Sequence, residues 1–188
     1  MHMEHLRTFI SIPLPDKISR TVISSFKQLP IELDKLRIVE EMNLHITLKF
    51  IGDTRLDDLQ KIISSLENAV SDTPSFDIQL IKGVCLPPHK PHALACAIQN
   101  NSKLTDLHKA IESELSSAGL TQPDRKKYNP HITVARVKKQ NILTTEEISA
   151  IENWKVHSIL HSEKIVLYES KLSSSGPTYT ELQTIHLA

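Results

Sequence analysis

A chain of 188 residues, 39% of them hydrophobic and 23% charged, is long enough to bury a core and has the composition of one folded domain. Its 22 basic and 22 acidic residues cancel, which excludes a protein that coats long nucleic acid through a general positive charge. No apolar run reaches the ~20 residues of a membrane span, and the N-terminal residues lack the features of a signal peptide. We therefore expect a cytoplasmic protein that has no membrane partner.

Hydrophobic periodicity divides the chain into strands and helices in mixed order. In the first part we expect strands at 6–14, 36–39, 44–51 and 76–84 and helices at 16–26 and 56–70. In the second part we expect strands at 93–98, 131–137, 164–168 and 179–186 and helices at 104–115 and 144–153. Gly52-Asp53 is expected to end its strand. Several strands follow one another without a helix between them, which favours an α+β fold with mostly antiparallel sheet.

The two cysteines, Cys85 and Cys96, lie in apolar stretches and do not form a CxxC motif. Neither a zinc site nor a thioredoxin-like redox motif is therefore indicated. We expect two buried free thiols in a reducing compartment.

One short pattern occurs twice along the chain. The segments NLHITL at 43–48 and NPHITV at 129–134 both contain His-Ile-Thr followed by an aliphatic residue, and both lie on expected strands. Each copy is followed by an expected helix and then by a strand that begins with an aromatic residue, Phe76 or Trp154. The repeat indicates an internal duplication of about half the chain.

Strand geometry gives this repeat a chemical meaning. Within each copy the histidine and the threonine point to one face of the strand, and the aliphatic residues point to the other. An unpaired imidazole or hydroxyl costs about 1–3 kcal/mol when it is buried, so we expect the His-Thr face to line a cleft. If the two copies face each other across a pseudo-twofold axis, His45, Thr47, His131 and Thr133 converge on one space.

Two histidines and two threonines in one cleft suit the cleavage of a phosphodiester. The reaction needs a base for the attacking group and an acid for the leaving oxygen, and two imidazoles can divide these roles near neutral pH. Threonine hydroxyls can donate hydrogen bonds to the phosphoryl oxygens. A single His-x-Thr is typical of a structural histidine, so the prediction depends on the matching pair. The reaction requires no metal.

Basic residues gather around the second copy, at Arg125, Lys126, Lys127, Arg136, Lys138 and Lys139. Such a concentration suits an anionic substrate, although a solvated lysine face accounts for most of these residues. Arg136 follows Thr133 by three residues, so a regular strand would place it on the opposite face. A bulge or a strand end would be needed to aim it into the cleft.

The chain resembles the RNA 2′,3′-cyclic phosphodiesterases, once called 2′-5′ RNA ligases, of the 2H phosphoesterase superfamily. The matching stretches run from residue 7 to about residue 180 and are RTFISIPLPD, NLHITLKFIGD, KKYNPHITVARVK and KIVLYESKLSSSGPTY. The resemblance implies a single bilobal domain over residues 1–188. Its two lobes would be related by a pseudo-twofold axis, each with a mostly antiparallel sheet and outer helices, and the cleft would lie between the sheets.

The resemblance also implies the reaction and the roles of the residues. A terminal 2′,3′-cyclic phosphate of RNA would be opened to a 2′-phosphate, with His45 as general acid and His131 as general base. Thr47, Thr133 and Arg136 would bind the phosphate. RNA ends that bear a cyclic phosphate, tRNA halves among them, would be the partners of a monomeric enzyme that needs no metal or other cofactor.

Several alternatives stay open on the sequence. The same residues suit a phosphodiesterase for 2′-5′ linked oligoadenylate or for ADP-ribose cyclic phosphate, and the reverse reaction would join tRNA halves through a 2′-5′ bond. A non-catalytic RNA-end-binding module would keep the basic residues but could lose a motif histidine.

Residues outside the motifs raise two further questions. Ala95 and Ile38 stand where the family often has tryptophan or another aromatic residue, so Tyr128 becomes the candidate for base stacking. The alternative is that Tyr128 packs against the edge of a lobe. His157 and His161 have the spacing of a helical metal pair, but their local sequence reads as extended, and no third ligand is obvious.

Overall fold

The computed structural model of the protein describes residues 5–173 and 176–188, so residues 174–175 of the last matching stretch and residues 1–4 lie outside the described part. In chain order the strands are β1 His5–Pro13, β2 Leu36–Ile38, β3 His45–Arg55, β4 Phe76–Leu86, β5 Ala93–Ile98, β6 His131–Val137, β7 Lys155–Ser162, β8 Lys164–Leu172 and β9 Pro177–His186. The α-helices are α1 Asp16–Lys27, α2 Leu59–Val70, α3 Ser102–Ser117 and α4 Thr145–Asn153. These elements agree in type and order with those expected from periodicity, but some bounds differ: β3 ends later than expected, α2 begins at Leu59 rather than at residue 56, and β8 continues to Leu172.

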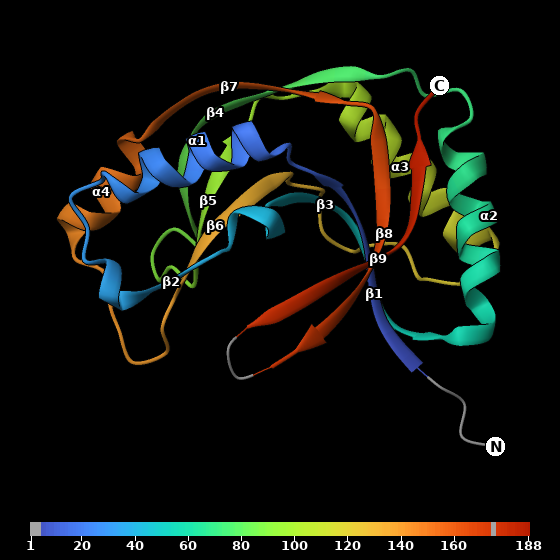
Figure 1. Ribbon diagram of the computed structural model, residues 1–188, viewed down its shortest axis with the longest axis horizontal. Coiled ribbons are helices and arrows are strands. Elements are labelled where there is room, and N and C mark those ends of the chain that lie inside the picture. The colour runs from blue at the N-terminus through green and yellow to red at the C-terminus, as the bar shows by residue number, and fades with distance from the viewer. Residues whose placement is uncertain (1–4, 174–175) are drawn as a thin grey trace.

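The described strands form one curled antiparallel sheet in the order β7-β4-β5-β6-β3-β1-β8-β9, with β2 paired to β6. Its two halves meet where β3 and β6 pair at Ile46 and Ile132. Figure 1 shows α1 and α4 beside the half of the sheet that contains β7, β4, β5 and β6. Helices α2 and α3 lie beside the half that contains β3, β1, β8 and β9. The α+β fold with outer helices is therefore confirmed, although hydrogen bonding across the junction joins the two expected sheets into one.

The internal duplication does not divide the chain into two contiguous lobes. The first unit runs β1-α1-β3-α2-β4, with β2 as an added short strand, and the second runs β5-α3-β6-α4-β7. Within each unit the first long strand pairs with the motif strand, β1 with β3 and β5 with β6. The third strand of the first unit, β4, instead pairs with β5 and β7 in the other half of the sheet. Strands β8 and β9, rather than β4, extend the half of the sheet that contains β1 and β3.

Helix α4 lies directly on β4 because a glycine stands at the point of contact. A Cβ atom on Gly83 would overlap the carbonyl oxygen of Ile151, so a larger residue would force the helix away. The Gly83 amide also donates to the carbonyl of Trp154 at 2.8 Å. The helix begins with the expected capping box, in which Thr144 and Glu147 each accept from the other's backbone amide.

The expected end of the β3 strand at Gly52-Asp53 is wrong, because β3 continues to Arg55. Gly52 has a φ of 84° and lies at a register shift against β1, where Phe9 pairs with Phe50 and Thr8 pairs with Gly52. Glycine reaches this φ readily, and here it permits a bulge within the strand rather than a turn after it.

Two smaller expectations concern the cysteines and the membrane. Cys85 and Cys96 are buried and free, and burial raises the pKa of their thiols to about 11 and about 12. The expected buried free thiols are thus confirmed. Among the described helices, none combines the length and apolarity needed to cross a membrane.

Candidate active site

A cavity of about 230 Å³ opens where β3 and β6 meet. The motif residues His45, Thr47, His131 and Thr133 all line it. The structure therefore brings together four side chains that are separated by up to half the chain. All four are half-buried, in contrast to the fully buried isoleucine between each pair.

Each motif strand bulges immediately after its threonine. In the pairing of β1 with β3, Ser11 lies opposite Thr47 and Ile10 lies opposite Lys49, so Leu48 is the extra residue. A bulge of this kind shifts the alternation of side chains by one residue.

The second motif strand repeats this geometry. In the pairing of β5 with β6, Ala95 lies opposite Thr133 and Leu94 lies opposite Ala135, so Val134 is the extra residue. As a result Arg136 returns to the face of Thr133 and lines the cavity. The bulge that Arg136 would need in order to reach the cleft is therefore present.

The first bulge brings Phe50 to the cavity in the same way. Phe50 follows His45 by five residues, as Arg136 follows His131, and its side chain is 61% exposed. Our reading of the sequence missed this residue, because regular alternation from Thr47 would place it on the far face. The equal spacing of Phe50 and Arg136 from their histidines is the signal that could have found it.

Both imidazoles are oriented by their own strands. Nδ1 of His45 lies 2.7 Å from the carbonyl oxygen of Asn43, and Nδ1 of His131 lies 2.9 Å from that of Asn129. A carbonyl oxygen only accepts hydrogen bonds, so Nδ1 carries a proton in each ring. Nε2 is then the nitrogen that can exchange a proton with a ligand.

His45 sits in an aromatic environment. Its ring centroid lies 5.1 Å from that of Phe9 and 5.4 Å from that of Tyr179, which meets it edge-on. Burial lowers the pKa of His45 below 6.5, and the positive charges of His131 and Arg136 lower it further, against the opposing effect of the Asn43 carbonyl. The neutral imidazole is therefore favoured in the free cavity.

A family model described as the 2′-5′ RNA ligase superfamily matches residues 14–165, which include both motif strands and the five predicted site residues. The chain belongs to the 2′-5′ RNA ligase superfamily. The family predicted from the paired motifs is thus confirmed.

Two relatives of this superfamily member carry the same name. An RNA 2′,3′-cyclic phosphodiesterase of Methanothermobacter thermautotrophicus is 31% identical over 189 residues, which cover 97% of this chain and 99% of that protein. One of Thermotoga maritima is 28% identical over 179 residues, which cover 94% and 93%.

Solved structures show the same fold. E. coli LigT complexed with 3′-AMP has a TM-score of 0.76 at 22% identity, covering 98% of this chain and 99% of that one. A protein of Thermus thermophilus has a TM-score of 0.78 at 20% identity, covering 96% and 97%.

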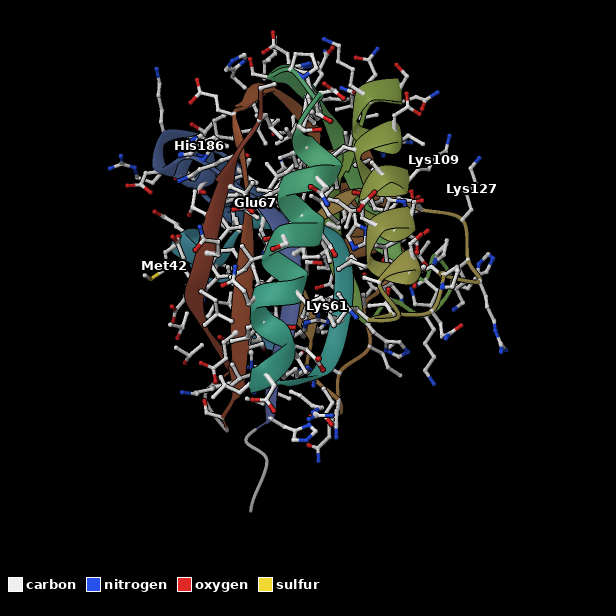
Figure 2. All side chains as sticks on the ribbon, turned by 90° about the vertical axis from the view of Figure 1, so that its right-hand side faces the viewer. Met42, Lys61, Glu67, Lys109, Lys127 and His186 are labelled. Atoms are coloured by element: carbon white, nitrogen blue, oxygen red, sulfur yellow. The ribbon has the colours of Figure 1, made fainter. Side chains whose placement is uncertain are left out.

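Most of the basic residues around the second superfamily motif lie away from the cavity. Residues 125–127 and 138–139 are exposed and do not line it. Figure 2 shows Lys127 extending outward from the loop beside α3. These side chains form the solvated face that accounts for most of the cluster, whereas Arg136 faces the cavity.

Tyr128 is held by protein contacts. Its hydroxyl donates to the carbonyl oxygen of Thr47 at 3.1 Å, and its ring stacks on His108 with centroids 3.9 Å apart. The alternative that Tyr128 packs at the edge of a lobe is therefore confirmed, and base stacking by this ring stays a prediction. The contact also ties the segment before His131 to the first motif.

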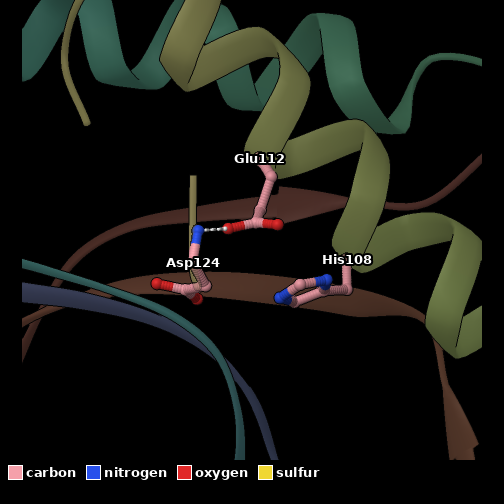
Figure 3. Close-up of side chains that lie close together, drawn as sticks. All are labelled: His108, Glu112 and Asp124. Carbon is pink, nitrogen blue, oxygen red and sulfur yellow. Dashed lines mark hydrogen bonds between the residues drawn. The ribbon is translucent and has the colours of Figure 1, made fainter. Parts of the chain in front are cut away.

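The loop between α3 and β6 is held by a second set of contacts, which involves a cluster of three titratable side chains. His108, Glu112 and Asp124 present ligand atoms within 4.8 Å of one another (Figure 3). Lys49, next to the bulge in β3, places Nζ 2.6 Å from Glu112 and 2.8 Å from Asp124. Burial pulls the pKa of Lys49 down, but the two carboxylates outweigh it and raise that pKa. The lysine ammonium is thus the cation of this cluster, and the residues as arranged do not fit a divalent metal.

His157 and His161 lie on β7, which confirms that their segment is extended. On a helix, residues i and i+4 lie one turn apart and can bind one metal. On a strand they lie too far apart along the chain to do so. His161 Nδ1 instead lies 2.6 Å from the Asp77 carboxylate.

Proposed function

We propose that this superfamily member hydrolyses a terminal 2′,3′-cyclic phosphate of RNA and leaves a 2′-phosphate. The convergence of two imidazoles and two threonine hydroxyls on one cavity carries the proposal. The name shared by the relatives agrees with the enzyme class expected from the sequence.

The proposed reaction has two proton transfers, one at each histidine. Nε2 of His131 takes a proton from water, whose oxygen forms a bond to phosphorus. The bond between phosphorus and the 3′ oxygen breaks, and Nε2 of His45 gives that oxygen a proton. Each turnover leaves His131 protonated and His45 neutral, and exchange with solvent restores the pair. The division into acid and base follows the family resemblance.

The lowered pKa of His45 is compatible with its role as acid only when substrate is bound. In the free cavity, burial and the neighbouring positive charges favour the neutral ring. A phosphate monoanion between the two imidazoles supplies the opposite charge, which raises the pKa of His45 and favours the protonated form. Substrate binding thereby prepares the acid.

Thr47, Thr133 and Arg136 are proposed to hold the phosphate. The hydroxyls donate to the nonbridging oxygens, and the guanidinium balances the charge that grows on them during attack. Their placement on both motif strands allows the phosphorus to be held from two sides. The proposal uses no metal or other cofactor.

The shape of the cavity suggests how the terminal nucleotide lies. Because β3 and β6 are antiparallel, Phe50 and Arg136 lie toward opposite ends of the cavity, with the histidines between them. We place the terminal base on the ring of Phe50, since exposed aromatic rings stack on bases of any sequence. A volume of about 230 Å³ suits one sugar and its phosphate, so the rest of the RNA lies outside.

Because each half of the sheet contributes one motif, we propose that the whole chain acts as a single bilobal domain and works as a monomer. Neither half alone carries both histidines.

A substrate panel with product analysis tests the proposal. The purified protein, treated with EDTA, is given an RNA oligonucleotide that ends in a 2′,3′-cyclic phosphate, and the expected product is the 2′-phosphate. A 3′-phosphate would overturn the assigned leaving oxygen. Faster turnover of 2′-5′ oligoadenylate or of ADP-ribose cyclic phosphate would replace the substrate, and binding without turnover would favour an end-binding module. RNA with a 5′-hydroxyl, added without ATP, tests for the reverse joining reaction.

A further inference from the structure

Two arginines face each other at one end of the cavity. Arg37 of β2 and Arg136 of β6 are direct cross-strand partners, and both line the cavity with exposed side chains. Like charges placed directly opposite each other in a sheet repel and reduce stability. An anion that binds both guanidinium groups would remove this repulsion.

No protein group neutralises this pair within the described part of the chain. Neither guanidinium takes part in an ion pair among residues 5–173 and 176–188. Glu40 also lines the cavity, but its carboxylate is not within ion-pair distance of either arginine. The pair is therefore an uncompensated positive site at the cavity wall.

The two arginines differ in their relation to the reacting centre. The charge of Arg136 lowers the pKa of His45, so its guanidinium lies close enough to act on that ring. Arg37 lies on β2, which pairs with β6 at Ala135–Val137, beyond the point where β3 and β6 pair at Ile132. Arg136 thus serves the central phosphate, whereas Arg37 stands at the rim.

The cavity is too small for a second phosphate, which would therefore lie at this rim. The cavity volume of about 230 Å³ accommodates a terminal sugar and its phosphate, and the phosphodiester on the 5′ side of that sugar must lie outside. Neighbouring strands are about 5 Å apart, so two arginines on adjacent strands suit two successive phosphates of one RNA strand.

We infer that Arg37 binds the phosphodiester on the 5′ side of the terminal nucleotide, so that the site selects an RNA end of at least two nucleotides over a free nucleoside cyclic phosphate. The inference rests on the proposed function for the identity of the terminal group. Guanidinium binds phosphate oxygens through two parallel hydrogen bonds, which Arg37 is free to make at the rim. The carboxylate of Glu40 limits the affinity because it repels the same phosphate.

The test compares three ligands that differ at one linkage. They are a nucleoside 2′,3′-cyclic phosphate, a dinucleotide with the same cyclic end, and that dinucleotide with an uncharged methylphosphonate linkage. Turnover is measured with the wild-type protein and with Arg37→Ala. Equilibrium binding is measured in the His45→Ala/His131→Ala background, with and without Arg37→Ala. The matched control is Arg20→Ala, which removes an exposed arginine of α1 that does not line the cavity.

We expect the wild-type protein to prefer the charged dinucleotide over both other ligands by about tenfold, as for one charge-assisted contact. Arg37→Ala should remove most of this preference and lower the salt dependence of log Kd for the dinucleotide by about 0.7. Arg20→Ala should keep the preference.

Two results would overturn the inference. One is an equal loss for the mononucleotide and the dinucleotide in Arg37→Ala, which would assign Arg37 to the reacting phosphate. The other is equal binding of the charged and uncharged linkages by the protein that retains Arg37. Failure of the proposed function looks different, because no cyclic phosphate would then be opened, although an Arg37-dependent binding preference would still uphold the second phosphate site.

Discussion

Ile46 and Ile132 face each other where β3 meets β6, and both side chains are fully buried. Each lies between a motif histidine and a motif threonine. This buried pair therefore sets the separation between the two imidazoles, and it couples the core of the protein to the geometry of the cavity.

The first prediction concerns the two histidines. Alanine at His45 or at His131 should reduce turnover of an oligonucleotide with a 2′,3′-cyclic phosphate end by about a hundredfold or more, because each removes one proton transfer. Circular dichroism and thermal unfolding should show an intact fold. His89→Ala, which changes an exposed loop histidine outside the cavity, is the control and should keep full activity. Near-normal turnover by the double variant would exclude the two-histidine mechanism.

The second prediction concerns the protonation of His45. An NMR titration should place the pKa of its ring below 6.5 in the free protein, because burial disfavours the cation. The unfolded chain then binds this proton more readily than the folded chain, so His45 should make the protein less stable as the pH falls below 6.5.

Two changes should raise the pKa of His45. Inorganic phosphate in the cavity adds negative charge, and Tyr179→Ala opens the ring to water on one side. If neither change moved the titration, burial and local charge would not be the cause of the shift.

The third prediction concerns Phe50. Phe50→Ala should raise the KM for a terminal nucleotide by about tenfold, since stacking on one base contributes roughly 1–3 kcal/mol. kcat should change less, because the ring does not take part in proton transfer. Phe50→Trp should preserve the KM, which separates an aromatic contact from a general effect of substitution. A loss confined to kcat would argue against base binding at this position. Because the ring is largely exposed, its removal should leave the fold intact.

The fourth prediction concerns Lys49. Its side chain is 2% exposed and pairs with Glu112 and with the half-exposed Asp124, so Lys49→Met leaves two carboxylates without their cation. We expect a loss of about 2–3 kcal/mol in the free energy of unfolding, less than for a fully enclosed pair. Denaturant titration measures it.

Two comparisons make the Lys49 measurement specific. Lys109→Met removes the exposed pair with Asp106, in which both side chains are about 70% exposed, and should cost less than 1 kcal/mol. Adding Glu112→Gln and Asp124→Asn to Lys49→Met should recover part of the stability. No recovery would show that packing of the lysine stem, rather than charge, accounts for the loss.

The elements of this fold could be predicted because each has a local signal. Period-two patterns marked the strands, helical patterns marked the helices, and the repeated His-Ile-Thr predicted that four side chains would share a face. Whether β4 pairs with its own unit or with the other one could not be predicted, because strand partners depend on contacts distant in sequence.

The remaining features of the site depend on backbone irregularities. A bulge has no necessary sequence signature, so the aim of Arg136 stayed open and Phe50 was missed. The same glycine suits a turn or a bulge, which explains the wrong end of β3 at Gly52. The position of Tyr128 was decided by His108 and by the carbonyl of Thr47, neither of which is near it in sequence.

The bond from each imidazole Nδ1 to the carbonyl two residues before it has a consequence for how this site tolerates change. Many catalytic histidines are aligned by an acidic side chain that a single mutation can delete. Here the aligning group belongs to the peptide backbone at Asn43 and Asn129, and every amino acid supplies it. This hydrogen bond is thus insensitive to the identity of those two neighbours and depends on the path of the main chain.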